Sequence, residues 1–415
     1  CPATPGQDAK EPFVIPVSLG LISRGGRALP LQLAHWDAPE TGSRTFVLTQ
    51  ASETFTFTQV DEEPVPSILR GFSAPVVLDF DYSDAQLLAL LEHDTDPFNR
   101  WEAGQRLALR RALKAISAEG DATQAPVLDE AYLDAMRQVL RHPMLDAAFK
   151  ELVLTLPSEG YIAEQLDVVD PQRVHAVREA MRQQLANALQ ADWAWAFDAH
   201  QDNGAYRPDP VSSGRRALAG MALAYLCLAA RDSGDPVWPG KTYQRFKTAG
   251  NMTDRFNALN ALVGSAHAHA EPALARFHAL FKDEALVLDK WFALQAGATD
   301  RGGNILPAVK QLLKHPDFTL RNPNRARSVV FSYCSANPGA FHRADAAGYV
   351  FWSERVMELD SINPQVAARL ARALDRWKKL ADPYRSAARE AIARVAAKPD
   401  LSNDVREVVT RALAD

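Results

Sequence analysis

Cysteine is scarce in this sequence of 415 residues, with three copies at positions 1, 227 and 334. They are too few and too scattered for a disulfide framework or a structural zinc site, and a reducing, cytoplasmic setting fits them best. A stretch of about 18 apolar residues is also missing, so no transmembrane helix is expected. The 46 basic and 51 acidic residues leave a net charge of −5, which argues against a protein that coats nucleic acid. We therefore expect a soluble globular protein with neither a membrane nor a nucleic acid as its partner.

Familiar catalytic motifs are absent as well. None of the ten histidines has another histidine four residues further on, so the HExxH helix of zinc peptidases does not occur. Glycine-rich phosphate loops and the GxSxG nucleophile elbow are missing too. The sequence therefore predicts no catalytic residue and no metal ligand in this chain.

Two small clusters of potentially reactive side chains leave a hydrolase function open as an alternative. His267, His269 and Glu271 stand close together, but residues two positions apart diverge on a helix, which favours solvated loop histidines over a metal site. Cys334 has His342 eight residues further on, and a buried small side chain is favoured over a Cys/His nucleophile. A hydrolase built on either cluster is one rival hypothesis.

The first 82 residues have the pattern of β-structure. Short segments rich in β-branched and aromatic residues alternate with turn residues, which predicts a small antiparallel β-sandwich. Pro64 and Pro66 favour an extended crossover over a ladder strand. The expected strands are 13–22, 29–33, 45–49, 54–60 and 75–80.

After Tyr82 the apolar residues recur with the period of helices. Ser83 is a natural N-cap, and Asp-Pro pairs at 96–97 and 170–171 place proline at the first position of two longer helices, over residues 96–116 and 170–200. Further amphipathic segments of about 10–18 residues follow, separated by Gly, Pro or Asn. Helices of similar length with short loops predict an α-solenoid of HEAT or armadillo-like helix pairs over residues 83–415. The expected fold class is mainly α, with a small N-terminal all-β domain over residues 1–82.

Positive charge is concentrated at the C-terminal end. Residues 321–415 contain 16 Lys and Arg against 11 Asp and Glu, whereas residues 1–320 have a net charge of −10. Two Asn-Pro pairs, at 322–323 and 363–364, begin helices and place Arg327, Gln365 and Arg369 within about two turns of their starts. A helix N-terminus prefers anions, so the arginines gain nothing from the dipole there. These side chains either are simply solvated or converge on a carboxylate or a peptide backbone.

Eight segments keep a characteristic order along the chain: residues 54–84, DPFNRWEAGQ at 96–105, LTLPSE at 154–159, NMTDRFNAL at 251–259, LDKWFALQA at 288–296, NPNRARS at 322–328, SANPGAFH at 335–342 and NPQVAARL at 363–370. Together they resemble the C-terminal half of the bacterial aminopeptidase N family, which are gluzincin zinc metallopeptidases. The resemblance extends from about residue 12 to the C-terminus. It covers nearly the whole sequence.

The resemblance carries expectations about architecture. In that family an N-terminal β domain and a thermolysin-like catalytic domain precede an Ig-like β-sandwich and a helical domain, and the resemblance begins at the sandwich. It implies that the single zinc ion and the catalytic motifs belong to the missing domains. It also implies that the helical domain caps the active-site cleft and shapes a peptide-access cavity. Arg327, Gln365 and Arg369 match family positions that point into this cavity.

The expected function is that of the non-catalytic C-terminal region of a bacterial, cytoplasmic zinc aminopeptidase of the membrane alanyl aminopeptidase type, which cleaves N-terminal residues from peptides. The chain would be inactive alone and without a cofactor of its own. Its partners would be the N-terminal and catalytic domains of the same polypeptide, and peptide substrates. The start at Cys1, neither an initiator Met nor a signal peptide, favours a piece of a longer protein. The main alternative is a free-standing helical-repeat module that binds proteins or peptides.

Overall fold

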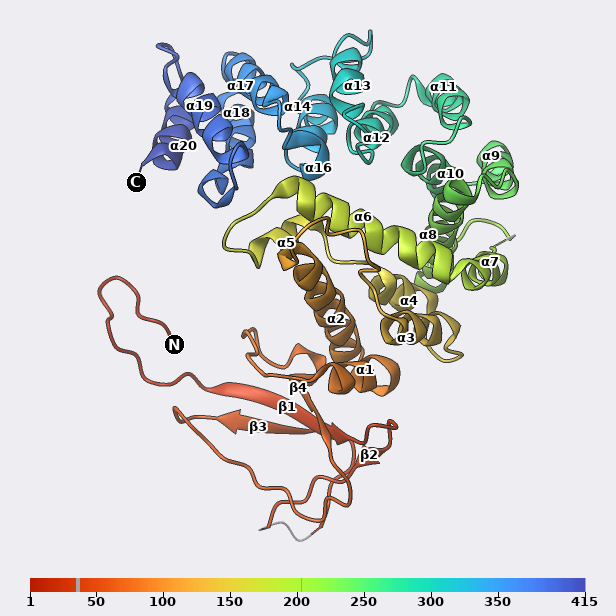
Figure 1. Ribbon diagram of the computed structural model, residues 1–415, viewed down its shortest axis with the longest axis vertical. Helices are drawn as coiled ribbons and strands as arrows, with labels where there is room; N and C mark the ends of the chain where they lie inside the picture. Colours follow the sequence, from red (N-terminus) through yellow and green to blue (C-terminus); the bar gives the residue numbers. More distant parts are fainter. Residues whose placement is uncertain (35–37, 203, 415) are drawn as a thin grey trace. The chain divides into compact units, whose positions relative to one another are not determined.

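Figure 1 shows the computed structural model of the chain, which describes residues 1–34, 38–202 and 204–414. The contacts within it define two units, each discontinuous in sequence: Cys1–Arg111, Leu128–Leu156 and Asp209–Ala217 form the first, and Ala112–Val127, Pro157–Pro208 and Leu218–Asp415 form the second. The domain boundary between residues 82 and 83 is inferred from the sequence pattern and does not coincide with these units. It stays a prediction.

The β-structure of the first unit is one four-stranded antiparallel sheet. Its strands are β1 Ile15–Ile22, β2 Ala28–Leu29, β3 Arg44–Leu48 and β4 Val65–Ile68. β1 pairs with the other three, its first half with β3 and its second half with β2 and β4. Leu21, Leu29 and Leu31 form the buried core beside it. This sheet confirms the expected β-structure ahead of the helices.

The segment expected to be a crossover contains a strand. Pro66 belongs to β4 and stands opposite Leu21 of β1. Proline cannot donate to a ladder, but β4 pairs with β1 alone in the described sheet, and an edge strand tolerates a missing donor. The carbonyl oxygen of Pro66 accepts a hydrogen bond from the Tyr82 hydroxyl at 2.7 Å. The prediction that Pro64 and Pro66 exclude a ladder strand was therefore wrong.

The segment 54–60 is not a strand, although its residues alternate as a strand's do. Phe55 and Phe57 pack on Phe46 of β3, with ring centroids 4.5 and 5.9 Å away. A single isolated bridge joins Phe57 to Leu33. The alternation therefore reflects which side chains face the sheet. The prediction of a strand over 54–60 was wrong.

The segment 75–80 is not a strand either. The carbonyl oxygens of Leu78 and Phe80 accept hydrogen bonds from the Arg106 guanidinium, at 3.0 and 3.3 Å. A side chain thus satisfies backbone groups that a neighbouring strand would otherwise pair with. The prediction of a strand over this segment was therefore wrong.

Helices make up most of the remaining chain. The first unit contains η1 Arg70–Phe72, α1 Asp84–His93, α3 Glu130–Arg141 and α4 Ala147–Leu154, and both α2 Pro97–Ser117 and α8 Pro210–Ser233 begin in it and end in the second unit. The second unit contains α5 Glu159–Glu164, α6 Pro171–Ala188, α7 Gln190–Ala199, α9 Val237–Thr248, α10 Met252–Gly264, α11 Ala270–Phe281, α12 Ala285–Ala296, α13 Ile305–Leu312, α14 Pro323–Ala326, the π-helical turn η2 Arg327–Phe331, α15 Ser332–Cys334, α16 Pro338–Phe341, α17 Ala347–Asp360, α18 Pro364–Ala371, η3 Arg372–Leu374, η4 Trp377–Lys379, α19 Tyr384–Ala396 and α20 Asn403–Leu413.

Side-chain caps determine where several helices begin. Ser83 forms a capping box at α1, Asp170 accepts from the first backbone N–H groups of α6, and Asn363 caps α18. These starts confirm the sequence predictions. The segment 170–200, however, is two helices rather than one, because Leu189 leaves the helical region at φ −108° and ψ 21°.

The helices of the second unit pack against their neighbours in sequence. α9 lies against α10, α11 against α12, and α17 to α20 against one another. The buried rings of Trp193 and Trp352 each donate an indole N–H to a backbone carbonyl at 3.0 Å. Packing between sequence neighbours is typical of a helical-repeat domain and confirms the expected fold class. Among the described residues, no helix combines the length and the apolar character that a membrane span requires.

Candidate functional site

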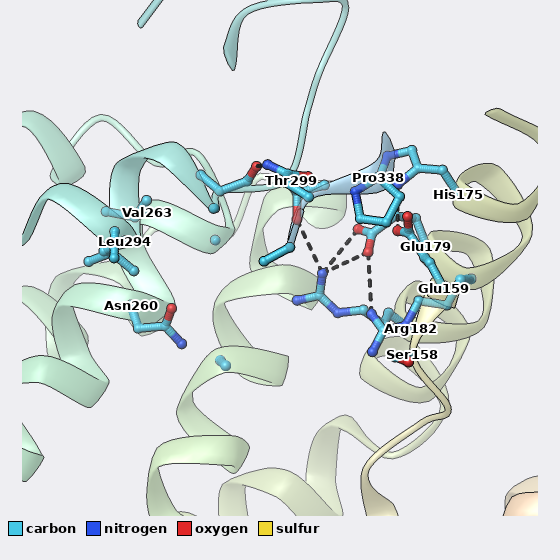
Figure 2. A pocket seen from close by; sticks show the side chains of 18 of the residues that line it. Ser158, Glu159, His175, Glu179, Arg182, Asn260, Val263, Leu294, Thr299 and Pro338 are labelled. Atoms are coloured by element: carbon cyan, nitrogen blue, oxygen red, sulfur yellow. Dashed lines mark hydrogen bonds and ion pairs between the residues drawn. The ribbon is translucent and has the colours of Figure 1, made fainter. Parts of the chain in front are cut away.

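A polar cavity of about 560 Å³ opens within the second unit. Its walls come from α5, α6, α8, α10 and α12, together with segments 297–299 and 335–338 (Figure 2). Parts of the chain that are far apart in sequence therefore meet around one space. A cavity of this size accommodates a small molecule or a few residues of a peptide.

One face of α6 supplies the charged groups of this cavity. His175, Arg178, Glu179 and Arg182 are spaced three and four residues apart, so their side chains share one side of the helix. An adjoining stripe of α6 is apolar and buried: Val174, Val177, Met181 and Leu185. Packing of that stripe turns the charged face toward the cavity.

Glu159 and His175 form an ion pair in the cavity wall. Glu159 Oε1 lies 2.7 Å from His175 Nδ1, and each side chain is 15% exposed. Burial alone would lower the pKa of His175, but the hydrogen bond and the charge of Glu159 outweigh it and raise that pKa. Glu159 Oε2 is buried and has no hydrogen-bond partner among the described residues. A ligand that donates a hydrogen bond to this oxygen would satisfy it.

Glu179 is held between two arginines. Its oxygens lie 2.8 and 3.1 Å from Arg182 Nη1, and Arg178 Nη1 lies 3.6 Å from Oε1. Burial would raise the pKa of Glu179, but Arg182 and Arg178 together lower it, so the carboxylate stays ionised. Arg182 also donates to the Thr299 hydroxyl at 3.4 Å. The charges of this cluster thus largely offset one another.

The segment 335–338 is anchored on both of its sides. Asn337 donates to two carbonyl oxygens at the end of α12, at 3.1 and 2.8 Å. Gln172 of α6 donates to two carbonyl oxygens at α16, at 2.9 and 2.6 Å. Gly339 needs to lack a side chain, because a Cβ there would lie 2.2 Å from His175 Nδ1. These contacts hold the cavity wall in place.

The cavity offers hydrogen-bond donors and acceptors within a short distance. Arg178, Arg182 and the Asn260 amide donate, whereas Glu159 Oε2 accepts. A peptide backbone presents both kinds of partner, so it suits this lining. A metal ion does not, because the single histidine is already paired with Glu159 and two arginines lie beside it.

The three residues expected to face a peptide cavity lie elsewhere in the second unit. Arg327 begins η2 and donates to Asn324 Oδ1 at 3.2 Å. Gln365 and Arg369 lie one turn apart on α18, which places them on one face of that helix. All three are exposed, and none of them lines the polar cavity. The grouping of Arg327 with the other two stays a prediction.

The neighbouring Arg325 has a structural role that the sequence did not reveal. It is 6% exposed, its Nε donates to Asp289 Oδ1 at 2.6 Å, and its guanidinium lies 5.0 Å from the centroid of the Phe292 ring. Of the two arginines in NPNRAR, one is therefore buried and paired and the other is exposed.

The small clusters considered as alternatives make mainly structural contacts. The ring of His269 stacks on Tyr243 with centroids 4.8 Å apart, and its backbone N–H donates to His267 Nδ1 at 3.1 Å. Cys334 is buried, and burial raises its thiol pKa well above the usual value. A thiol that stays protonated is a poor nucleophile, so the prediction of a buried small side chain is confirmed. His342 is hydrogen-bonded with a tyrosine hydroxyl at 2.8 Å.

The charged face of α6 was missed in the sequence. The signal was nevertheless present, because polar residues recur at 175, 178, 179 and 182 with the helical period. A second signal lies in the family resemblance. Three segments that carry it, 154–159, 288–296 and 335–342, each contribute residues to the cavity wall.

Two family models together match almost the whole chain. The model described as "Domain of unknown function (DUF3458_C) ARM repeats" matches residues 84–414. The model described as "Domain of unknown function (DUF3458) Ig-like fold" matches residues 1–81. The small N-terminal sheet is thus Ig-like by family, and the helical part consists of ARM repeats.

Three curated relatives are named aminopeptidase N. The chain is 35% identical over 413 residues to that of Escherichia coli (strain K12) and 36% identical over 398 residues to that of Caulobacter vibrioides (strain ATCC 19089 / CIP 103742 / CB 15). It is 33% identical over 415 residues to that of Haemophilus influenzae (strain ATCC 51907 / DSM 11121 / KW20 / Rd). The alignments cover 100%, 95% and 99% of this chain and 46%, 44% and 46% of the relatives. The chain therefore spans about half the length of these proteins.

A solved structure has the same fold over the same extent. The crystal structure of Legionella pneumophila aminopeptidase A in complex with aspartic acid superposes with a TM-score of 0.80 at 25% sequence identity. The match covers 96% of this chain and 45% of that chain.

Proposed function

The chain belongs to the family of ARM-repeat domains described as DUF3458_C and is homologous to the C-terminal part of aminopeptidase N, and on this premise we propose that it acts as the non-catalytic region of a zinc aminopeptidase. The observation that carries the proposal is the alignment of nearly the whole chain with three aminopeptidase N sequences. The lack of HExxH in its 415 residues supports a non-catalytic role. The zinc and its ligands then belong to another part of the enzyme, and this chain alone does not hydrolyse peptides.

In this proposal the helical domain caps the active-site cleft and shapes the cavity that peptides enter. The polar cavity supports such a role, because its volume of about 560 Å³ and its mixed lining suit a short stretch of peptide. Arg178 and Arg182 would attract carboxylates, and Glu159 Oε2 would accept a peptide N–H. The substrate would be held mainly through its backbone, which every peptide shares.

Arg327, Gln365 and Arg369 are proposed to contact the peptide on its way to the active site. They are exposed, so their hydrogen-bonding groups are accessible to a substrate. Two guanidinium groups would attract the C-terminal carboxylate of a peptide, and the amide of Gln365 can both donate and accept. The proposal further includes an Ig-like domain over residues 1–82, a helical domain over residues 83–415, and action in the bacterial cytoplasm.

A free-standing helical-repeat module that binds peptides is the second candidate. One observation favours it: every residue that lines the polar cavity lies in the second unit, so the cavity needs no other domain. Adding a separately produced aminopeptidase catalytic half distinguishes the two candidates. Restored peptide hydrolysis supports the aminopeptidase role, whereas peptide binding without association of the two halves supports the module.

The aminopeptidase role is tested in the intact enzyme that carries this region. Arg369→Ala and Arg327→Ala should each lower kcat/KM for a peptide of several residues by about 10–150-fold, the value of one lost charge-assisted hydrogen bond of about 1.5–3 kcal/mol. Turnover of a one-residue chromogenic substrate should stay unchanged, because its small leaving group does not extend to these side chains. The salt dependence of peptide turnover should decrease in parallel.

The matched control is Arg372→Ala, which removes an exposed arginine of the same region that is paired with Asp375 at 3.0 Å. Its peptide turnover should match that of the unmodified enzyme. Equal losses for the peptide and the chromogenic substrate would contradict a role in peptide access. Losses as large in the control would contradict the choice of these residues.

A further inference from the structure

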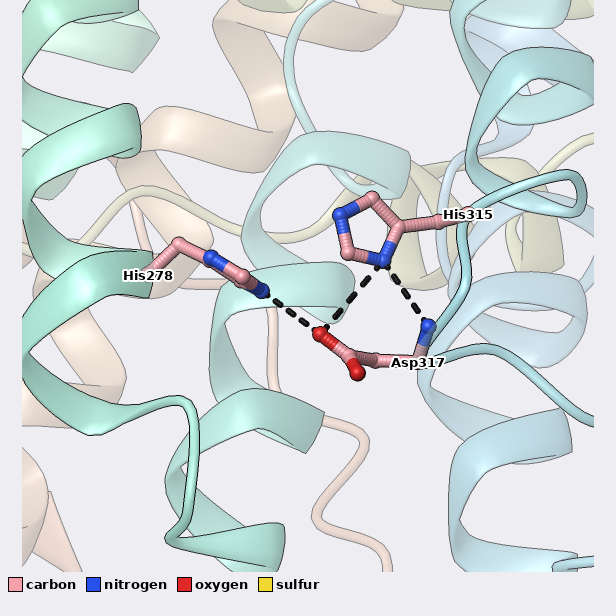
Figure 3. Close-up of side chains that lie close together, drawn as sticks. All are labelled: His278, His315 and Asp317. Atoms are coloured by element: carbon pink, nitrogen blue, oxygen red, sulfur yellow. Dashed lines mark hydrogen bonds and ion pairs between the residues drawn. The ribbon is translucent and has the colours of Figure 1, made fainter.

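A group of metal-ligating side chains lies outside the polar cavity. His278 comes from α11, and His315 and Asp317 come from the turn after α13 (Figure 3). In the described part of the chain they are the one set of three such residues whose ligand atoms all lie within 4.8 Å of one another. We propose that His278, His315 and Asp317 bind a divalent transition-metal ion of the zinc type.

The distances within this group are close to those of a metal site. His278 Nε2 lies 2.7 Å and His315 Nδ1 lies 3.7 Å from Asp317 Oδ2. Ligand atoms around a tetrahedral zinc ion, with bonds of about 2.0–2.1 Å, are roughly 3.3 Å apart. Side-chain adjustments of about 1 Å would therefore accommodate the ion. Two imidazoles with one carboxylate favour zinc, nickel or copper over calcium or magnesium.

The ligands are held in place before any ion binds. The carbonyl oxygen of Asp317 accepts a hydrogen bond from Arg325, which holds the turn after α13 in place. The ring centroids of His278 and His315 lie 5.1 and 5.3 Å from that of Trp291. Since these contacts already restrict the side chains, binding an ion would cost little conformational freedom.

The charges around the group are compatible with a cation. Asp317 supplies an acidic side chain beside the two imidazoles. His315 Nδ1 accepts a hydrogen bond from the backbone N–H of Asp317 at 3.1 Å, and a bound ion would replace that donor. The guanidinium of Arg325, which would repel a cation, is paired with Asp289 at 2.6 Å.

Three protein ligands leave a coordination position for water or for a group from another molecule. The side chains of His278 and Asp317 are 25% and 37% exposed, so an ion can enter from solvent. A bound ion would link α11 to the turn after α13. The proposed site revises the expectation that this chain holds no metal. The two histidines are 37 positions apart in the sequence, which explains why spacing did not reveal the site.

The test is a calorimetric titration of the chelator-treated 415-residue chain with Zn²⁺ and with Ni²⁺, supported by the visible spectrum of the Co²⁺ form. We expect one equivalent of ion per chain. His278→Ala and His315→Ala should each weaken binding by about 10-fold or more, the size of effect that even outer-shell changes produce at metal sites. Asp317→Asn, which keeps the shape of the side chain, should change the Co²⁺ spectrum.

The matched control is His269→Ala, which removes a partly buried histidine of the neighbouring segment and leaves the three ligands intact. It should bind like the unmodified chain. Far-UV circular dichroism of each variant shows that it is folded. Absence of saturable binding by the unmodified chain would overturn the proposal, and so would equal affinity of folded His278→Ala or His315→Ala.

Discussion

Charged side chains occur both in the polar cavity and on the exposed surface with Arg327 and Arg369. The two regions differ in how far water reaches these charges. In the cavity, Glu179 and Arg182 are each 21% exposed and hydrogen-bonded to one another. The two surface arginines are exposed to water. A charge removed from water needs a partner to offset its desolvation, whereas a solvated charge does not. Changes in the cavity should therefore alter stability, and changes at the surface should alter only what binds there.

The largest effect is expected from Gly339→Ala. The new methyl group would lie 2.2 Å from His175 Nδ1, so the ring or the wall has to move. Overpacking of this kind should lower the free energy of unfolding by about 3 kcal/mol in urea denaturation. When His175 has already been replaced by Ala, Gly339→Ala should cost much less, because the ring that it would contact is gone. If the two changes are simply additive, the close packing of Gly339 on His175 is not what constrains the wall.

A smaller loss is expected from Glu179→Ala, which leaves Arg182 without its main partner. For a pair that is mostly but not fully buried, we expect a decrease in the free energy of unfolding of about 2 kcal/mol. Glu407→Ala is the matched control, because Glu407 pairs with Arg411 across one helical turn at the surface and is 70% exposed. Its effect should stay below about 0.5 kcal/mol. Equal effects of the two changes would remove the distinction between cavity and surface.

The ion pair of Glu159 with His175 should make stability depend on pH. Because the folded-state pKa of His175 is raised above its unfolded value of about 6.5, the pair stabilises fully below that pH, and its contribution is lost as pH rises through the folded pKa. His175→Gln should flatten the dependence of the urea midpoint on pH above 6.5. His342 acts in the opposite direction: burial lowers its pKa to about 4, so stability falls as pH drops from 6.5 toward that value. If the urea midpoint of His175→Gln falls as steeply above pH 6.5 as that of the unmodified chain, the ion pair is not the cause of this pH dependence.

The smallest stability effect is expected at the exposed surface. Arg327→Ala and Arg369→Ala should each change the free energy of unfolding by less than about 0.5 kcal/mol, because neither removes a buried contact. Thermal or urea denaturation checks this directly. A loss above about 1 kcal/mol for either variant would assign that arginine to structure and make its kinetic effects uninformative about peptide access.

Local chemistry explains which sequence predictions of the fold succeeded. The starts of α1, α6 and α18 follow from Ser83, Asp170 and Asn363, whose side chains satisfy nearby backbone N–H groups whatever the rest of the fold does. The break at Leu189 was missed because nothing in its own residue type requires a helix to end there.

Predictions of the sheet succeeded less well because strand pairing is not local. Phe55 and Phe57 alternate like a strand but face β3 without joining its ladder, whereas Pro66 does join the sheet, at its edge. Both outcomes depend on which backbone lies alongside, and residues distant in sequence supply it.

The sequence by itself determined the spacing of the charged residues on α6 and the caps that orient their helices. It also carried the family resemblance, and three of the eight segments that carry it contribute to the cavity wall. Only the tertiary structure decided that Glu159, His175 and Gly339 meet, that Arg325 is buried while Arg327 is exposed, and that His278 lies beside His315 and Asp317. Helical period and capping act over a few residues, whereas burial and pairing depend on neighbours brought together by packing of the whole unit.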